Sequence, residues 1–377
     1  MSIIIGADFV PTKSNEALCA EGNVLGLFGE ELLNIVMNAD FRIFNLEVPL
    51  TDNQSPIKKC GPNLIAPVET VRIYKEANIN LLTLANNHML DQGVDGYYST
   101  VRALRENGID SVGGGDNLTN AAKPYYFNVF GKTIGVYACV EHEFSIAGIE
   151  RPGANPFDPI YSLDQIQEAK CGCDYLIVLY HGGKEHYRYP SPNLQKVCRR
   201  IIEKGADLII CQHSHCIGCE EKYGDGVIVY GQGNFLFDYS EVECWKTGLL
   251  VSIDNQLSVS YIPLVKDAEK VRLANNKEAE EIMAGFNKRS EEINKSGFIE
   301  EKYHSFSEAM SESIYSSFSF YDSFFFRAIN KLTGNHLRRM RNKIRFSQKK
   351  RLEMINRIDC EAWRELSLAV LENEHDI

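Results

Sequence analysis

The first 240 residues alternate short apolar runs with segments of helical periodicity. Three such segments, 68–78, 97–108 and 193–205, repeat apolar residues every three or four positions, and a glycine ends each of the last two, as at many helix C-termini. Strands that alternate with helices of this length predict an α/β fold with a layered sheet. The strands are expected at 2–6, 41–46, 79–85, 133–138, 174–180, 206–211 and 226–230.

The pattern changes further along the chain. Two alternating segments, 247–253 and 256–265, are joined by an Asp-Asn pair and predict a β-hairpin. Strand alternation then stops, and the residues that follow are rich in Lys, Glu and Asn and permit helix. We therefore expect two parts, a main domain at 1–265 and a helical, partly basic C-terminal extension at 266–377.

Composition narrows the class of protein. The 377 residues are 44 % hydrophobic and 24 % charged, which is typical of a globular chain, and no apolar run is long enough to predict a membrane-spanning helix. The formal net charge of −11 argues against a nucleic-acid-binding surface. Eleven cysteines at irregular spacing indicate no disulfide framework, so we expect a reduced, cytoplasmic protein.

One segment departs from the acidic average. Residues 327–357 hold eleven Lys and Arg against one acid, Glu353. A basic helix face is often simply solvated, and this is one interpretation. The other is contact with an acidic polymer or with an anionic membrane surface through 315–357, which would associate the protein with the inner face of the membrane.

Polar, metal-competent residues follow five of the predicted strands. In open α/β sheets the loops at the carboxyl ends of the strands converge on ligand sites. Each residue alone has an ordinary explanation: a lone Asp caps a helix or turn, and His88 could be a satisfied core histidine. The joint pattern, in chain order and always after a strand, favours function. Its members are Asp8, Glu47, Asn87 with His88 and Asp91, His181 with Glu185, and His213 with His215.

The donor types indicate which ions suit such a site. Mixed carboxylate, imidazole and amide ligands are typical of Mn, Fe or Zn, and Mg is the alternative. A carboxylate able to bridge, with enough ligands for two ions, predicts one or two divalent metals. A two-metal centre supplies a nucleophile near neutral pH and holds both oxygens of an in-line displacement.

The motifs together resemble the CapA family of capsule and poly-γ-glutamate synthesis proteins, a branch of the calcineurin-like metallophosphoesterase superfamily. The resemblance rests on GAD (6–8), FNLEVPLT (44–51), LTLANNHMLDQG (82–93), HGGKEH (181–186), GADLIICQHSHCIGCEE (205–221) and IVYGQGNFLFD (228–238). It implies a four-layer α/β/β/α sandwich. It also implies metal ligands at Asp8, Glu47, Asn87, His181, His213 and His215, with Glu47 bridging.

The resemblance also implies a catalytic role for His88 as the acid that protonates the leaving oxygen, with Asp91 orienting its ring. Two positions depart from the superfamily pattern: Val10 replaces a His, and Glu47 replaces an Asp. These departures predict that one of two ions binds less tightly. Substrate-binding candidates on the motif loops, each of which could equally be a solvated group, are Glu185, Lys184, Asn234 and Lys59.

The sequence thus predicts a metal-dependent hydrolase of phosphoesterase type, linked to capsule or surface-polymer biosynthesis. Its expected partners are an anionic small-molecule or polymer substrate and the polymer-synthesis machinery. Two alternatives stay open. One is a non-catalytic accessory protein that keeps the fold as a binding module, and the other is a γ-glutamyl amide hydrolase that uses the same metal centre.

Overall fold

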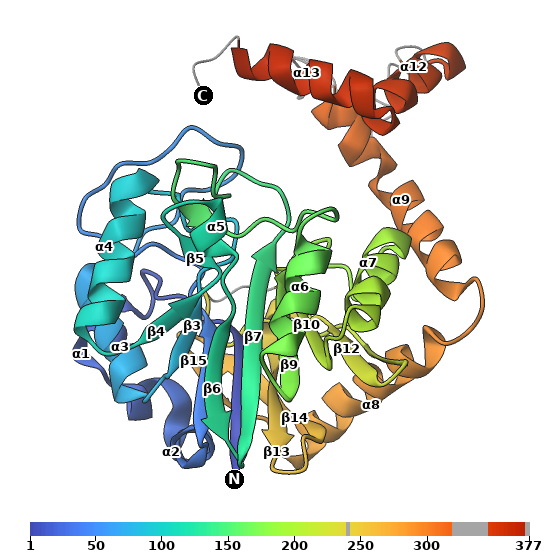
Figure 1. Ribbon diagram of the computed structural model, residues 1–377. Helices are drawn as coiled ribbons and strands as arrows, with labels where there is room; N and C mark the ends of the chain where they lie inside the picture. The colour runs from blue at the N-terminus through green and yellow to red at the C-terminus, as the bar shows by residue number, and fades with distance from the viewer. Residues whose placement is uncertain (239–241, 319–345, 374–377) are drawn as a thin grey trace, which may run out of the picture. The chain divides into compact units, whose positions relative to one another are not determined.

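The computed structural model describes residues 1–238, 242–318 and 346–373 (Figure 1). The chain divides into two compact units, Met1–Ile299 and Glu300–Ile377. The first holds all the described strands. The second is helical, with α12 (Gln348–Asp359), α13 (Glu361–Asn373) and most of α9 (Phe298–Ser317).

Two large sheets form the centre of the first unit. Each sheet has a run of parallel strands, whose carboxyl ends therefore lie at one edge of that sheet. Antiparallel strands extend this run on one side in the seven-stranded sheet and on both sides in the six-stranded sheet. The seven-stranded sheet runs β15 (Lys270–Leu273), β14 (Val259–Asp267), β13 (Thr247–Asp254), β1 (Ser2–Asp8), β2 (Phe41–Asn45), β3 (Leu81–Thr83), β4 (Asp110–Val112). The six-stranded sheet runs β11 (Glu220–Tyr223), β12 (Gly226–Tyr230), β10 (Leu208–Gln212), β9 (Tyr175–His181), β7 (Lys132–Val140), β6 (Tyr125–Val129).

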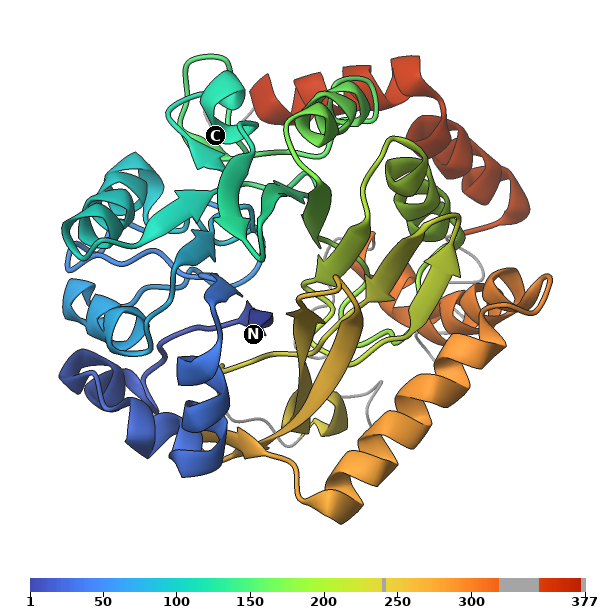
Figure 2. The ribbon, with the colours of Figure 1, turned by 60° about the horizontal axis from the view of Figure 1, so that its bottom comes forward.

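Side-chain alternation along the strands produces four layers. In β1, Ile3 and Ile5 pack into a core between the two sheets, whereas Ile4 packs against helices on the outer face. In β9, Ile177 faces the same inner core and Val178 faces the other helical layer. The predicted α/β/β/α sandwich is confirmed. The outer layers are α2 (Val24–Asn38), α3 (Val71–Glu76) and α4 (Gly93–Glu106) on one side, and α6 (Ser162–Cys171) and α7 (Pro192–Glu203) on the other (Figures 1 and 2).

Short elements complete the first unit. A small sheet pairs β5 (Gly114–Gly115) with β8 (Gly153–Ala154). The remaining helical turns are α1 (Glu16–Glu21), η1 (Val68–Thr70), α5 (Leu118–Ala121) and η2 (Glu243–Lys246).

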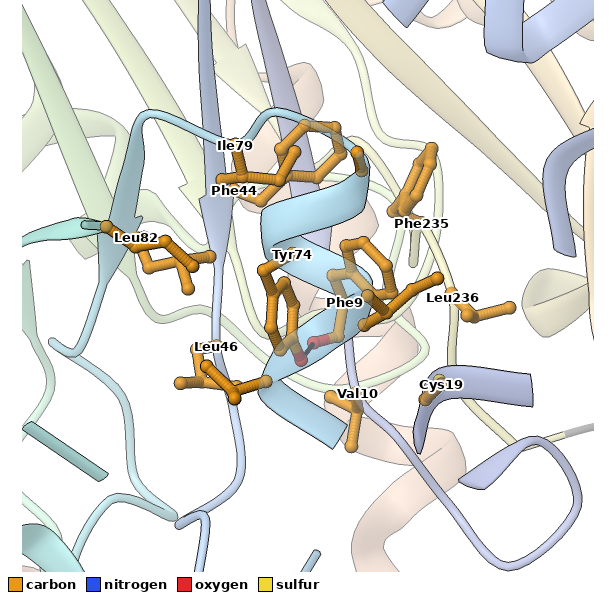
Figure 3. Close-up of a cluster of buried hydrophobic side chains, with 14 of the residues drawn as sticks. Phe9, Val10, Cys19, Phe44, Leu46, Tyr74, Ile79, Leu82, Phe235 and Leu236 are labelled. Atoms are coloured by element: carbon orange, nitrogen blue, oxygen red, sulfur yellow. Dashed lines mark hydrogen bonds between the residues drawn. The ribbon is translucent and has the colours of Figure 1, made fainter. Parts of the chain in front are cut away.

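An aromatic cluster fixes the chain immediately after β1 (Figure 3). The Phe9 ring lies 4.6 Å from the Tyr74 ring and 5.2 Å from that of Phe235, measured between ring centroids. The Tyr74 hydroxyl donates to the backbone oxygen of Phe9 at 2.7 Å, in a fully buried position. Val10 belongs to the same buried cluster. The residue before Phe9 is Asp8, so this packing holds a predicted metal ligand in place.

The first unit continues beyond residue 265, where the sequence placed a boundary. β14 and β15 are followed by α8 (Asn276–Glu292), which packs against the sheet strands through Phe286. The Phe286 ring lies 4.7 Å from that of Tyr261, and Arg289 Nε donates to the backbone oxygen of Gly218 at 2.7 Å. Polar composition had suggested a separate element, but one buried aromatic side chain ties this helix to the unit.

Replacement of Phe286 by alanine is expected to destabilise the protein by about 3–5 kcal/mol, because it empties a buried aromatic site. Chemical denaturation of the full chain measures this. Phe306→Ala, on the half-exposed part of α9, is the control and should cost much less. Equal losses for both variants would contradict the assignment of α8 to the first unit.

In the second unit α12 packs against α13, and the Arg357 guanidinium lies 5.8 Å from the centre of the Trp363 ring. Most of the basic segment 327–357 lies within 319–345, which is outside the described residues. Membrane contact through 315–357 therefore stays a prediction. Within the described ranges, none of the helices is both long and apolar enough to cross a membrane.

Candidate metal centre

The six predicted metal ligands come together at the edge where the parallel strands of both sheets end. Three lie at or just after β1, β2 and β3 of the seven-stranded sheet, and three at or just after β9 and β10 of the six-stranded sheet. All six side chains are buried. They are Asp8, Glu47, Asn87, His181, His213 and His215.

Short distances join these side chains into one group. His181 Nε2 lies 3.2 Å from Glu47 Oε1 and 3.1 Å from Asn87 Oδ1. Its ring is 4.9 Å from that of His213, between centroids. Among the described residues, the donor atoms of Glu47, His213 and His215 form a cluster in which all lie within 4.8 Å of one another. That spacing suits a single metal ion in contact with all three.

The loop after β10 brings both of its histidines to the centre. In an extended strand His213 and His215 would face opposite sides. Both residues instead adopt left-handed backbone conformations, with φ of 76° and 53°. Such conformations cost about 1–3 kcal/mol each in a non-glycine residue and cluster at functional sites. This turn is what lets both histidines reach the same centre.

Unpaired polar atoms show that the pocket suits a cation. Asp8 Oδ2, both carboxylate oxygens of Glu47, and His213 Nδ1 are buried and make no hydrogen bond in the described part of the chain. Buried carboxylates without a partner are costly, and a bound cation removes that cost. These atoms are also the oxygen and nitrogen donors that divalent ions such as Mn, Fe and Zn accept. The residues present therefore fit a divalent ion.

Burial and mutual charge shift the acidities of this group in different directions. Burial raises the pKa of Glu47 well above its ordinary value, and the charge of Asp8 adds to the effect. Burial also opposes ionisation of Asp8, but the close approach of His215 and the charges of His181 and His215 outweigh it and lower the pKa of Asp8 to about 2. Burial lowers the pKa of His213 to about 3 and that of His181 to about 4. Neutral imidazoles are the form that binds metal.

His215 is held by two neighbours. Its Nδ1 lies 2.8 Å from Asn234 Oδ1 and 3.4 Å from Asp8 Oδ2. A proton on Nδ1, shared with these acceptors, leaves Nε2 for a metal ion. Burial lowers the pKa of His215, but the partnership with Asp8 and the charge of Glu47 overcome this and raise it to about 9. Asn234, predicted as a substrate group, thus lies where it orients a ligand.

The predicted acid His88 lies directly beside Asn87 in the chain, and its Nδ1 is 2.6 Å from Asp91 Oδ2. Asp91 is fully buried, and the backbone N–H of Leu64 donates to the same oxygen at 2.6 Å. Lys59 pairs with the other oxygen of Asp91, and its Nζ is 3.2 Å from His88 Nδ1. The predicted pairing of His88 with Asp91 is therefore present, and Lys59 belongs to the same buried group.

The other two substrate candidates occupy the loop after β9. Lys184 and Glu185 are exposed there, and Glu185 is close enough for its charge to act on His213. A role for either in substrate binding stays a prediction.

Sequence reasoning missed several neighbours of the centre. Asn45 Nδ2 donates to Asp8 Oδ1 at 2.7 Å, and Glu143 Oε2 accepts from Asn87 Nδ2 at 3.2 Å. The Trp245 ring lies 4.8 Å from the ring of His215. Lys266 is buried behind these aromatic groups. Asn45 stands in a motif that the sequence singled out, but nothing in the local sequence marks the other three.

Comparison with known proteins finds several relatives, among them the following three. A capsule biosynthesis protein CapA from Bacillus anthracis is 34 % identical over 210 residues, covering 53 % of this chain and 51 % of that protein. A PGA biosynthesis protein CapA from Bacillus subtilis is 33 % identical over 205 residues, covering 53 % and 54 %. A probable polyglutamine synthesis accessory protein from Mycobacterium tuberculosis is 28 % identical over 235 residues, covering 57 % and 60 %.

The chain thus spans about half the length of the two CapA relatives. A family model described as bacterial capsule synthesis protein PGA_cap matches residues 23–239, which is more than half of the chain and includes five of the six predicted ligands. The resemblance inferred from the motifs is confirmed: the chain belongs to the PGA_cap family of bacterial capsule synthesis proteins.

Proposed function

We propose that this protein is a metal-dependent hydrolase that cleaves an ester, most simply a phosphoester, in the synthesis of a bacterial surface polymer. The observation that carries the proposal is the set of unpaired, buried donors on Glu47, Asp8 and His213, which lies next to a paired His88 and Asp91. A site that only bound an anion would gain nothing from buried carboxylates.

Glu47, His213 and His215 would hold the ion, and Asp8, Asn87 and His181 surround them. A divalent ion there supplies Lewis-acid polarisation of the scissile bond and a nucleophile near neutral pH. The metal could be Mn, Fe, Zn or Mg, as one or two ions.

The protein's own part in the chemistry is proton transfer. With Nδ1 of His88 turned to Asp91, the opposite nitrogen of the ring is left to hold the proton that a departing oxygen needs. Asp91 fixes the tautomer, and the pairing with Lys59 balances its buried charge. Such an arrangement protonates a leaving group without moving the backbone.

Metal analysis of the purified full chain, followed by a phosphate-release screen, tests this function. We expect a divalent metal to copurify, chelation to abolish phosphate release, and added Mn²⁺ to restore it. A γ-glutamyl peptide in the same screen tests the amidase alternative. Activity that survives exhaustive chelation would contradict a metal-dependent reaction.

A second candidate is a non-catalytic accessory role. The Mycobacterium tuberculosis relative is described as a probable accessory protein of polymer synthesis, which favours this alternative. It predicts that the metal-bound protein hydrolyses neither phosphoesters nor γ-glutamyl amides, while it still binds an anionic polymer. The pairing of His88 with Asp91 favours catalysis, since binding alone needs no proton donor.

A further inference from the structure

A buried lysine occupies the loop that joins β2 to η1. Residues 52–65 of this loop contain neither helix nor strand, and a bridge between Leu50 and Ala66 brings its ends together. Lysines on loops are mostly exposed, and the neighbouring Lys58 is exposed here. Lys59 differs, because only 2 % of its side chain is exposed. A lysine buried to this extent is almost always paired.

The partner of Lys59 is the fully buried carboxylate of Asp91. Lys59 pairs with Oδ1 of this carboxylate. Oδ2 accepts a hydrogen bond from the backbone N–H of Leu64 at 2.6 Å and lies 2.6 Å from His88 Nδ1. Lys59 Nζ is also 3.2 Å from that ring nitrogen. Both carboxylate oxygens are thus engaged, and a rotation of the carboxylate would break contacts on either side.

Hydrogen bonds on both sides of Lys59 fasten the loop to the turn that carries Asp91. The backbone N–H of Ile57 donates to the backbone oxygen of Asp91 at 3.1 Å. Gln92 Nε2 donates to the backbone oxygen of Leu64 at 2.9 Å. Hydrogen bonds between charged groups are stronger than such neutral ones. The ion pair of Lys59 with Asp91 is therefore the contact that couples the loop most firmly to the carboxylate.

Exposure separates the roles of the three side chains. The His88 side chain is 12 % exposed, whereas those of Lys59 and Asp91 are 2 % and 0 % exposed. A substrate that arrives from solvent meets the histidine before the lysine. The route by which Lys59 can affect the reaction is thus its contact with Asp91.

We propose that Lys59 is a positioning residue. It holds the 52–65 loop against Asp91 and fixes the Asp91 carboxylate, which in turn orients the His88 ring for proton donation. The inference rests on the proposed function, in which His88 is the acid. It differs from the substrate contact expected from the sequence, because in this role the ammonium group does not meet the substrate.

Kinetics of the metal-loaded full chain test this role, with the most reactive ester from the phosphate-release screen. Lys59→Met should lower kcat by about a hundredfold, because a small misplacement of a catalytic group has an effect of that size. KM and metal content should stay at the wild-type level. Lys59→Arg keeps the charge and should recover most of kcat. Lys58→Met, at the exposed neighbouring position, is the matched control and should change none of these quantities.

A double variant tests whether Lys59 acts through Asp91. Two residues that work as one unit have non-additive effects. In an Asp91→Asn background, Lys59→Met should therefore lower kcat by less than about threefold. The double variant removes both buried charges, so this comparison decides the matter even where Lys59→Met alone does not fold. Full loss in both backgrounds would overturn the inference.

Hydrogen exchange of the full chain supplies a readout that needs no turnover. The amides of Ile57 and Leu64, both bonded to Asp91, should exchange at least about tenfold faster in Lys59→Met, because the loop opens more often. They should exchange at the wild-type rate in Lys58→Met. Wild-type exchange of both amides in Lys59→Met would overturn the inference, since the loop would then be held without the lysine.

The kinetic outcomes separate this inference from the proposed function. An active wild-type protein whose Lys59→Met variant keeps its kcat would overturn the inference and leave the proposed function standing. A raised KM with unchanged kcat would make Lys59 a substrate-binding group and would also overturn it. A metal-loaded wild-type protein that hydrolyses no ester would overturn the proposed function and, with it, the role of Lys59 toward His88.

Discussion

Replacement of His88 by asparagine is expected to lower turnover by about a hundred- to ten-thousand-fold while metal content stays at the wild-type level. The imidazole would supply a proton to the leaving oxygen, and asparagine keeps hydrogen bonding to Asp91 but cannot deliver that proton. The readouts are turnover of the most reactive ester from the phosphate-release screen and metal content by elemental analysis.

Substrates with different leaving groups sharpen this test. An ester whose leaving group is a weak base needs little protonation, so His88→Asn should damage its cleavage least. His304→Asn, at an exposed position in α9, is the control for a histidine change elsewhere. Loss of metal in proportion to lost turnover would instead make His88 a ligand.

Replacement of Glu47 by glutamine is expected to have two effects of opposite sign. Metal affinity should fall by about a hundredfold or more, because the carboxylate at the middle of the cluster loses its charge. The metal-free protein should become more stable, by about 1–3 kcal/mol, because two buried oxygens without hydrogen bonds are replaced by a neutral group.

Thermal unfolding with and without Mn²⁺ measures both effects on one sample. The ion stabilises the wild-type fold by mass action, by about 2.7 kcal/mol at a hundred times its dissociation constant, and the variant should show little of this. Glu31→Gln, on the exposed face of α2, should change neither quantity. A variant that binds Mn²⁺ as tightly as wild type would remove Glu47 from the ligand set.

The sequence predicted the sandwich well because its strands are buried on both faces. Runs such as 175–180 and 208–211 are apolar at every position, which marks a strand between two layers. The same argument missed α2, whose sequence is interrupted by Gly26 and Gly29, the latter with non-helical angles. It also missed edge strands such as β6 and β11, whose partly exposed side chains weaken the apolar pattern.

The convergence of the six predicted ligands was predictable because these residues lie at or just after strands, and strand ends fix position. The positions of Lys266 and Trp245 were not predictable in this way. Lys266 lies in β14, among the antiparallel strands of the seven-stranded sheet, and Trp245 lies in the η2 turn. Their contacts depend on how β13 and β14 fold back beside β1, which no local pattern encodes. The contact of Asn234 with His215 was likewise not predictable, because the motif indicates where the loop lies but not which residue the amide side chain contacts.

The origin of the ligands in both sheets has a mechanical consequence. The packing between the sheets is otherwise largely apolar, and apolar packing resists separation but has little directional preference. An ion bound by Glu47 from one sheet and His213 from the other would cross-link the two sheets at one end of that interface. Opening of the sandwich would then begin at the opposite end, where the chain starts, and amide exchange in β1 and β10 would slow together when the ion binds.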